Sequence, residues 1–368
     1  MLKITLTKRK MRKGKNMNMF FFFWSDFCGG AERRLLRIFN NISKNTNNFD
    51  IIIIGKSDKI NDFLEEYIGE LFLNIIVCSN IFQAIYIMMK NKYKIIFHFD
   101  VGFKKIPLII ISKLIKSKNI LTIADIKLAE LKLYSNKEKI SLRILTRLAN
   151  HIDILYPSKL NNFKEYYNVK NITYTPGSFT NLEEYKPLDK SNIIVFSSRL
   201  IEEKNPLLAL KAVNLCKNEL RNNKYKILIC GNGQELQSLV EYVKLNDLDD
   251  LVDFKGYINA KTILPNARVF LSLQKNENYP SQSLLESISS GCYIIASDVG
   301  DTKLIVKNDF GKTVDLNEVD ICKEIVKYLN YSEEEKNQII INSRRFAEEN
   351  FHIKKSVKYF NLLISNYS

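Results

Sequence analysis

Residues 268–300 read RVFLSLQKNENYPSQSLLESISSGCYIIASDVG, and this stretch decides the fold. The apolar runs RVFLSL and CYIIAS have the composition of buried strands, and SQSLLESISS between them has the spacing of a helix. A strand, a helix and a second apolar strand in this order form a parallel unit whose helix covers one face of the sheet. The loop QKNENYP, which joins the first strand to the helix, concentrates the polar residues of the stretch.

The same alternation continues along the whole chain. In the first half the expected strands are MFFFFW, DIIII, NIIVC, KIIFHF, NILTI and HIDILY; in the second half they are NIIVFS, KYKILIC, LVDF, RVFLSL and CYIIAS. Continuous apolar strands separated by helices indicate parallel sheets that are covered on both faces. A chain of 368 residues is too long for one typical domain, so we predict an α/β protein with two doubly wound sheets.

The segment TPGSFTNLEEYKPLDKSN marks the boundary, because turn residues cluster there before a new strand. We expect a basic tail at 1–17, an N-terminal domain at 18–185, a C-terminal domain at 186–343 and a closing helix at 344–368. The basic and apolar start of the chain has no small-residue cleavage site, so we interpret MFFFFW as a strand and not as part of a signal peptide. No apolar run reaches the roughly 18 residues of a transmembrane helix, so a cytoplasmic protein is expected.

Charge is distributed unevenly between the two halves. Residues 1–180 carry 30 basic and 14 acidic side chains, whereas residues 181–368 carry 25 and 26. A basic half suits an anionic membrane surface, an anionic acceptor or nucleic acid. The six cysteines form no C-x-x-C pair and the three histidines lack metal-ligand spacing, which favours reduced core thiols and no metal site.

The loop SRLIEEKNP after the strand NIIVFS places Arg199 and Lys204 just before a helix that begins near Pro206. A helix N-terminus carries partial positive charge, so two cations beside it form a site for a diphosphate. Arginine offers a fork of donors, and lysine offers a compact charge. The alternative is a solvated loop in which Glu202 and Glu203 pair with these cations.

In the opening stretch, Leu284, Leu285 and Ile288 share one face of the predicted helix. Glu286 lies about 200° around the helix from Leu284, so its side chain points away from the core. A carboxylate in that position can accept hydrogen bonds from both vicinal hydroxyls of a ribose. Ser281, at the start of the helix, adds free backbone amides for a phosphate or a sugar. The alternative is an ordinary surface glutamate on an amphipathic helix.

Together these two stretches resemble the donor-binding half of the retaining glycosyltransferases of family 4 (glycosyl transferases group 1), which have the GT-B fold of two facing Rossmann-like domains. The family's Arg-Leu-x-x-x-Lys loop, which holds the donor diphosphate, matches Arg199–Lys204. The second of the family's two glutamates, which binds the ribose, matches Glu286. Eight residues separate Glu277 from Glu286 where the family has seven, so either Glu277 or Asn278 takes the contact with the donor sugar.

The resemblance extends over most of the chain. ICGNGQELQSLVEYVKLNDLDDLVDFKGYI is similar to the family's segment from a Gly-rich turn to the strand near the nucleobase, and SDFCGGAERRLL resembles its Gly-Gly-Ala-Glu loop. The chain from 344 onward is similar to the family's closing helix, which crosses back to the first domain. The resemblance assigns donor or acceptor contacts to seven further residues: Gly29, Gly30, Gly231, Gly233, Tyr257, Pro280 and Ser281.

The resemblance implies a function. A sugar would pass from a nucleoside-diphosphate sugar, with UDP as the expected carrier, to a glycan or lipid-linked acceptor with retention of configuration. The pathway would be that of a cell-surface polysaccharide such as capsule, O-antigen or lipopolysaccharide. No cofactor or metal is implied besides the sugar nucleotide, because Arg199, Lys204 and helix N-termini can neutralise the leaving diphosphate. The basic first half would then attract a lipid-linked acceptor at the inner face of a membrane.

Some alternatives stay open. Family members often place a histidine after a mid-domain strand, but this chain has Ala124 there, while His98 and Asp100 end a different strand and His98 could equally be a core residue. Rival functions are a nucleotide-sugar epimerase of the same architecture and a non-catalytic basic protein that binds membrane or nucleic acid. Aromatic residues lie within apolar runs and not between lysines, which disfavours nucleic acid. No G-x-G-x-x-G follows a strand, which disfavours a dinucleotide-dependent dehydrogenase.

Overall fold

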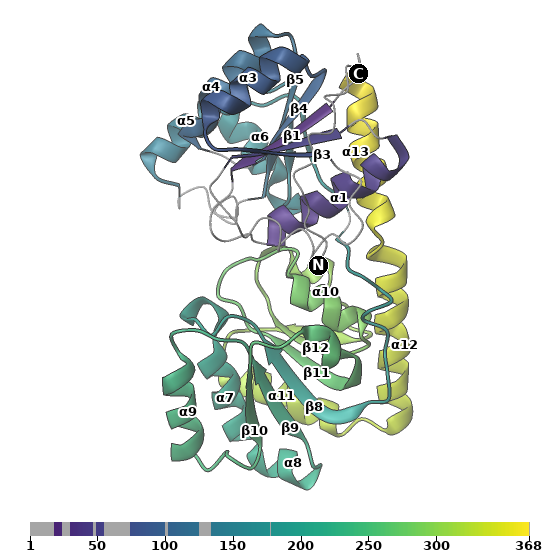
Figure 1. Ribbon diagram of the computed structural model, residues 1–368. Coiled ribbons are helices and arrows are strands. Elements are labelled where there is room, and N and C mark those ends of the chain that lie inside the picture. The colour runs from purple at the N-terminus through teal and green to yellow at the C-terminus, as the bar shows by residue number, and fades with distance from the viewer. Residues whose placement is uncertain are drawn as a thin grey trace, which may run out of the picture. The chain divides into compact units, whose positions relative to one another are not determined.

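The computed structural model describes residues 18–23, 30–46, 49–54, 74–99, 102–124, 134–176 and 178–367. The chain divides into two compact units. One comprises the described residues up to Pro176 together with those from Lys354 onward, and the other spans Gly177–Ile353. Each unit is built around a parallel sheet (Figure 1). The sequence placed the corresponding boundaries at 185/186 and 343/344, which lie nine residues after and ten residues before the boundaries of the compact units at 176/177 and 353/354.

The sheet of the first unit has seven parallel strands in the order β3-β2-β1-β4-β5-β6-β7. The strands are β1 (Asn18–Phe23), β2 (Phe49–Ile54), β3 (Asn74–Cys78), β4 (Ile95–Phe99), β5 (Lys118–Ile123), β6 (His151–Ile154) and β7 (Ile172–Tyr174). β2 and β4 are buried along their whole length, as a sheet with two covered faces requires. All six apolar runs expected in this half form strands. β7 was not predicted, because three residues are too few to show a period.

Helices cover both faces of this sheet. They are α1 (Gly30–Thr46), α3 (Ile81–Asn91), α4 (Ile106–Leu114), α5 (Asn136–Leu148), α6 (Leu160–Tyr167) and the last helix, α13 (Ile353–Tyr367). α3 packs against α4, and α4 packs against α5. α13 lies beside α1 (Figure 1), and the Phe360 ring on α13 is 5.3 Å from Phe39 on α1. Phe39 in turn lies 5.1 Å from Phe97 of β4, so the last helix completes the aromatic core of the first unit.

A buried polar cluster also fastens α13 to β6 and to the residues after β7. The Tyr359 hydroxyl on α13 donates to the Asp153 carboxylate at 2.6 Å, and the Thr175 hydroxyl donates to both carboxylate oxygens at 2.7 and 2.8 Å. Asp153 is fully buried, and burial raises its pKa to about 7 although both hydrogen bonds act in the opposite direction. The helix that returns to the first unit is therefore α13, held by packing and by hydrogen bonds.

The second unit has a sheet of six parallel strands in the order β10-β9-β8-β11-β12-β13. Its strands are β8 (Ser191–Ser197), β9 (Lys226–Cys230), β10 (Val252–Gly256), β11 (Ala267–Ser272), β12 (Tyr293–Ser297) and β13 (Gly311–Val314). The helices of this unit are α7 (Pro206–Leu215), α8 (Lys217–Asn222), α9 (Leu236–Leu245), α10 (Gln282–Ser289), α11 (Glu318–Leu329) and α12 (Glu333–Asn350). The stretch 268–300 forms β11, α10 and β12, as predicted. Two parallel, doubly wound sheets confirm the predicted α/β class.

Candidate functional site

The strand order of the second sheet reverses between β8 and β11. From β8 the chain moves outward through β9 to β10, and it then returns to the other side of β8 with β11. At such a switch point the connections leave on opposite faces, and a crevice opens past the carboxyl ends of the strands. The loops after β8, β9, β11 and β12 end at this edge, and they contain most of the residues that the sequence singled out.

The loop after β8 carries Arg199 and Lys204. It closes as a 3-10 turn at Glu202–Lys204, directly before Pro206 begins α7. Arg199 is exposed, and its guanidinium has no hydrogen-bond or ion-pair partner among the described residues. Lys204 is half-buried and its ammonium donates to the side-chain carbonyl of Gln274. Burial and the positive charge of Arg199 lower the pKa of Lys204 to about 8. Two cations that repel each other in this way are stabilised when an anion binds beside them.

The carboxylates of this loop do not neutralise its cations in the way that the alternative interpretation required. Glu202 pairs with Lys275 in the loop after β11, with 2.7 Å between Nζ and Oε1. Glu203 favours the charged form of Lys204, but its effect on the pKa is smaller than the opposing effects of burial and Arg199. The loop therefore keeps positive charge at the switch point.

Further contacts join the loops after β8 and β11. The backbone amide of Lys275 donates to the Glu203 carbonyl at 2.9 Å. Asn205 precedes α7 in a left-handed conformation, with φ 53°, and its side-chain amide donates to the Leu273 carbonyl at 2.9 Å. The two loops that flank the switch point are thus held at a fixed distance by backbone and side-chain bonds.

Gly231 and Gly233, in the loop after β9, press against the loop that carries Arg199. A Cβ atom on Gly231 would lie 1.8 Å from the Ser198 carbonyl oxygen, and one on Gly233 would lie 2.1 Å from the Leu200 carbonyl oxygen. No heavier residue fits at either position without moving the neighbouring backbone. The two glycines therefore position the residues on either side of Arg199, and their expected direct contact with a nucleotide stays a prediction.

Glu277, in the loop after β11, is only 7% exposed, and its Oε1 accepts a hydrogen bond from the Asp301 amide at 2.6 Å. Gly300 makes this contact possible, because its φ is +51° and a Cβ there would lie 2.0 Å from the Glu277 carboxyl carbon. Glu277 thereby anchors the turn that follows β12. Asn278, the next residue, is half-buried. Which of the two reaches a donor sugar stays a prediction, and sequence reasoning missed Gly300 and Asp301.

The helix α10 has the predicted amphipathic character. Leu284, Leu285 and Ile288 are buried, while Glu286 is half-buried. The Gln282 side chain donates to Glu286 Oε1 at 3.0 Å, so a neighbour one turn earlier orients the carboxylate. Its binding of a ribose stays a prediction.

The start of α10 and the end of β10 hold the remaining predicted residues of this unit. Tyr279 and Pro280 are joined by a cis peptide bond, and Ser281 follows as the buried residue before the first helical turn. The Ser281 hydroxyl lies 3.3 Å from that of Ser283 and does not cap the helix. Tyr257, next to β10, is 79% exposed and presents its ring to solvent.

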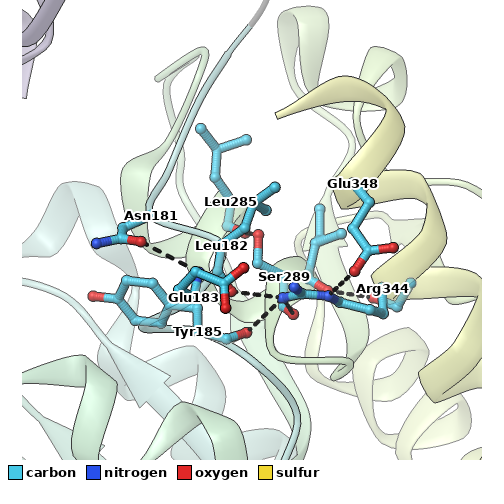
Figure 2. Close-up of polar contacts among 10 residues, drawn as sticks. Asn181, Leu182, Glu183, Tyr185, Leu285, Ser289, Arg344 and Glu348 are labelled. Atoms are coloured by element: carbon cyan, nitrogen blue, oxygen red, sulfur yellow. Dashed lines mark hydrogen bonds and ion pairs between the residues drawn. The ribbon is translucent and has the colours of Figure 1, made fainter. Parts of the chain in front are cut away.

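The far end of α10 is fixed by two neighbouring residues of α12. The Ser343 hydroxyl donates to the Ile288 carbonyl at 2.8 Å. Arg344 donates from one nitrogen to the Ser289 carbonyl at 3.2 Å and from another to Glu348 at 2.7 Å (Figure 2). The same guanidinium also binds the carbonyls of Leu182 and Tyr185, at 2.8 and 3.3 Å. Arg344 thus ties the segment that enters this unit, the helix α10 and the helix α12 together.

The first unit contributes less to a defined site. Gly30 is the first residue of α1, whereas Gly29 and Asp100 lie outside the described residues. His98 is 1% exposed, and its ring lies 2.8 Å from the Asn119 side-chain oxygen. Burial lowers the pKa of His98 to about 4, so this histidine is neutral and hydrogen-bonded inside the core. Contacts of Gly29 and Gly30 with a ligand stay predictions.

Two kinds of feature are absent from the part of the chain that the structure describes. None of its helices combines the length and the apolar character that crossing a bilayer demands. No group of three or more histidine, cysteine, aspartate or glutamate side chains in the same ranges could hold a metal ion.

Solved structures share this architecture over nearly the whole chain. Anabaena HepE in complex with UDP superposes with a TM-score of 0.79 at 14% identity, covering 95% of this chain and all of that one. The pneumococcal O-GlcNAc transferase GtfA in complex with UDP and GlcNAc gives a TM-score of 0.74 at 12% identity, covering 96% and 99%. Two Rossmann-like parallel-sheet domains and a long C-terminal helix define the GT-B class of fold, and this chain has that fold.

The sequence comparison narrows the class to a family. Residues 178–346 match the model of the family described as Glycosyl transferases group 1. The match covers most of the second unit, and it confirms the resemblance that was drawn from the motifs of this unit.

A curated relative aligns with part of the chain. It is the Campylobacter jejuni GalNAc-alpha-(1->4)-GalNAc-alpha-(1->3)-diNAcBac-PP-undecaprenol alpha-1,4-N-acetyl-D-galactosaminyltransferase, which is 31% identical over 172 residues, or 45% of this chain and 47% of the relative. The chain thus spans about half the length of that relative.

Proposed function

We propose that the protein is a retaining glycosyltransferase that moves a sugar from a UDP-sugar to a glycan or lipid-linked acceptor during the assembly of a cell-surface polysaccharide such as capsule, O-antigen or lipopolysaccharide. The observation that carries the donor half is the pair of cations at the switch point, where burial and the charge of Arg199 lower the pKa of Lys204. Solved proteins of the same fold hold UDP, which supports the choice of nucleotide. The undecaprenol-linked substrate in the name of the Campylobacter relative supports a lipid-linked acceptor.

In this proposal Arg199 and Lys204 bind the donor diphosphate and act as catalytic residues. When the bond from the sugar to the diphosphate breaks, negative charge grows on the leaving oxygen. Fixed cations beside that oxygen lower the barrier, because they stabilise the transition state more than the ground state. Arg199 supplies a planar set of donors, and Lys204 supplies a point charge whose position is set by Gln274.

The remaining residues bind the rest of the donor. Glu286 accepts hydrogen bonds from the ribose hydroxyls, in an orientation supported by Gln282. Either Glu277 or Asn278 contacts the transferred sugar. Because Glu277 already accepts the Asp301 amide, a sugar hydroxyl would share this carboxylate with the turn after β12. Backbone and side-chain groups near the nucleotide come from Gly29, Gly30, Gly231, Gly233, Tyr257, Pro280 and Ser281.

Nucleotide binding tests the donor site directly. The melting temperature of the purified protein would be measured with UDP, GDP, ADP and CMP, for the wild type, Lys204→Met and Lys211→Met. A ligand at 100 times its dissociation constant adds about 2.7 kcal/mol of stability. We expect stabilisation by UDP that is lost in Lys204→Met and kept in Lys211→Met, whose exposed lysine lies on α7. Equal responses of the two variants would overturn the assignment of Lys204.

Product analysis tests the reaction. The protein would be incubated with UDP-GlcNAc, UDP-GalNAc or UDP-glucose, with and without an undecaprenyl-diphosphate-linked glycan, and the products followed by NMR. Release of UDP with a new α-linkage from an α-configured donor supports a retaining transferase. Conversion of the UDP-sugar to its epimer without any acceptor would establish the rival epimerase function instead.

A further inference from the structure

The helix α3 exposes large apolar side chains on the face opposite the one that packs against the core of the first unit. Ala84, Ile87 and Met88 are the buried residues of this helix. Phe82, Tyr86 and Met89 follow one another at spacings of four and three residues, so they form a stripe along the opposite face. These three side chains are 77%, 61% and 52% exposed. A helix that covers a sheet ordinarily turns polar residues to the solvent here, so the stripe requires an explanation.

The neighbouring helix α4 repeats this arrangement. Leu108, Ile109 and Ser112 are its buried residues. Ile110 and Leu114, four residues apart, are 42% and 71% exposed, and Phe103 in the turn before the helix is 47% exposed. Because α3 and α4 pack against each other, the two stripes belong to one surface. We call this surface the α3–α4 face; it consists of Phe82, Tyr86, Met89, Phe103, Ile110 and Leu114. Figure 1 shows the two helices next to each other on the same side of the first sheet.

The charged residues in the sequence around the α3–α4 face are mostly basic. Between Asn80 and Ala124 the sequence has eight lysines and one acidic residue, Asp100. Six of these lysines are exposed: Lys90, Lys92, Lys104, Lys113, Lys116 and Lys118. The ammonium of Lys90 lies 5.8 Å from the centre of the Tyr86 ring, so basic and aromatic side chains are in direct contact at this surface.

We propose that the α3–α4 face docks the protein on an anionic lipid bilayer. The aromatic and aliphatic side chains enter the boundary between head groups and acyl chains, and the lysines extend their charged ends to the lipid phosphates. Each basic side chain near an anionic surface adds attraction that salt weakens. This inference goes beyond the proposed glycosyl transfer and rests on different residues, so either can fail without the other.

The charge pattern separates this partner from others. A second copy of the chain that docked through the same face would bring two sets of lysines together, which is unfavourable. A nucleic acid would meet apolar side chains along the middle of both helices, where phosphates and base edges gain nothing. An anionic bilayer has both an acyl-chain region that can take up the apolar side chains and charged head groups that attract the lysines.

Vesicle flotation tests the proposal with the full chain. Vesicles of phosphatidylcholine alone would be compared with vesicles that contain about 30% phosphatidylglycerol, at about 0.1 M salt and at a several-fold higher concentration. We expect binding to the anionic vesicles that weakens with salt and little binding to the neutral ones. Equal binding to both kinds of vesicle, or none to either, would overturn the proposal.

Two sets of variants locate the binding surface. The triple variant Phe82→Gln, Tyr86→Gln, Met89→Gln should lower the affinity for anionic vesicles about tenfold or more, because three interfacial side chains are lost. The variant Lys90→Gln, Lys113→Gln, Lys116→Gln should remove most of the salt dependence.

The matched controls lie on the second unit. Leu215→Gln with Leu245→Gln removes two apolar side chains that are 53% and 83% exposed, and Lys211→Gln, Lys244→Gln, Lys261→Gln removes three exposed charges. Both controls should bind vesicles as the wild type does, and circular dichroism would confirm that every variant is folded. Loss of binding in the controls would overturn the proposal. So would a wild-type dimer that the apolar triple variant converts to monomer, or binding to duplex DNA that the triple variant abolishes. UDP stabilisation of the same variants reports separately on the donor site.

Discussion

Lys204 illustrates how position changes the chemistry of a single residue. An exposed lysine stays charged well above neutral pH, whereas burial and Arg199 bring the pKa of Lys204 down to about 8. Its charge is therefore lost within the range that an ordinary titration covers. A bound diphosphate favours the charged form, so nucleotide binding and protonation of Lys204 promote each other.

The affinity for UDP should therefore fall as pH rises through about 8. The sign follows from the lowered pKa: the ammonium is present below this value and is lost above it, and UDP needs the ammonium. Titration calorimetry between about pH 7 and about pH 9.5 would measure the change. Lys204→Arg keeps its charge at all these values and should show a flat profile. A wild-type affinity that does not change with pH would contradict the role of Lys204.

Single residues also mark the limit of what could be predicted. Arg199, Lys204 and Glu286 could be singled out from the sequence as candidates, because the strand-to-helix loops of a parallel sheet end at one edge, and their contacts with a ligand stay predictions. The contact of Glu277 with the Asp301 amide could not be predicted from the sequence, since it depends on a left-handed Gly300 more than twenty positions along the chain. Gln274 was missed for a similar reason, because its contact with Lys204 joins two separate loops.

At the scale of elements, the site is an arrangement of loops that support one another. The loop after β9 contacts the loop after β8 through Gly231 and Gly233, and the loop after β11 binds it from the other side. The positions of Arg199 and Lys204, the proposed phosphate-binding residues, therefore depend on the backbone of the two neighbouring loops. The elements themselves were largely predictable from their apolar runs; β13 was missed because GKTV is short and mixes small and polar residues.

Gly233→Ala should cost more free energy of UDP binding than free energy of unfolding. The new Cβ would collide with the Leu200 carbonyl and push the loop that carries Arg199, so we expect at least roughly tenfold weaker binding, because displaced charge-assisted hydrogen bonds are lost. The measurement is titration calorimetry with UDP beside a thermal melt.

Gly291→Ala is the matched control for this change. Gly291 has a φ of +74° and a Cβ there would lie 2.8 Å from Ile340, at the end of α10 remote from the loop after β8. It should lower the melting temperature and leave UDP affinity unchanged. Weaker UDP binding in Gly291→Ala of the same size as in Gly233→Ala would show that general destabilisation explains both.

At the scale of the whole molecule, the first unit is made of two separate parts of the sequence. Its sheet comes from residues before Pro176, and α13 comes from the other end of the chain. Phe360 supplies packing and Asp153 with Tyr359 supplies the polar contact. The closing helix expected at 344–368 corresponds to the end of α12 and to α13, and only the structure identified the buried carboxylate that Tyr359 of α13 contacts.

The contribution of Asp153 to the stability of the first unit should decrease as pH rises from about 4 to about 7, whereas buried His98 and His151, whose pKa values are lowered, contribute in the opposite direction. Asp153 has a raised pKa, so the folded state holds a proton that the unfolded state releases at lower pH, and the resulting stabilisation is lost as pH rises through about 7. The difference in unfolding free energy between the wild type and Asp153→Asn should therefore fall by roughly 1–3 kcal/mol across this range, and calorimetric unfolding of both proteins would measure it.

Asp153→Asn should remove this pH dependence, because asparagine can still accept a hydrogen bond from Tyr359 and does not titrate. Asp315→Asn, which changes an exposed carboxylate of the second unit, should retain it. A decline of equal size in wild type and Asp153→Asn would assign the effect to other groups.

The return of α13 has a consequence for biosynthesis. Domains generally fold as they leave the ribosome, beginning with the earlier one. Here the strands of the first unit emerge early, but the helix that covers Phe39 and Phe97 is translated only after Gly177–Ile353. The nascent first unit therefore exposes this aromatic surface until Gly177–Ile353 has been synthesised and α13 follows. A premature stop codon directly before Lys354 would accordingly remove α13 from the first unit and destabilise it, whereas the second unit, Gly177–Ile353, would be complete.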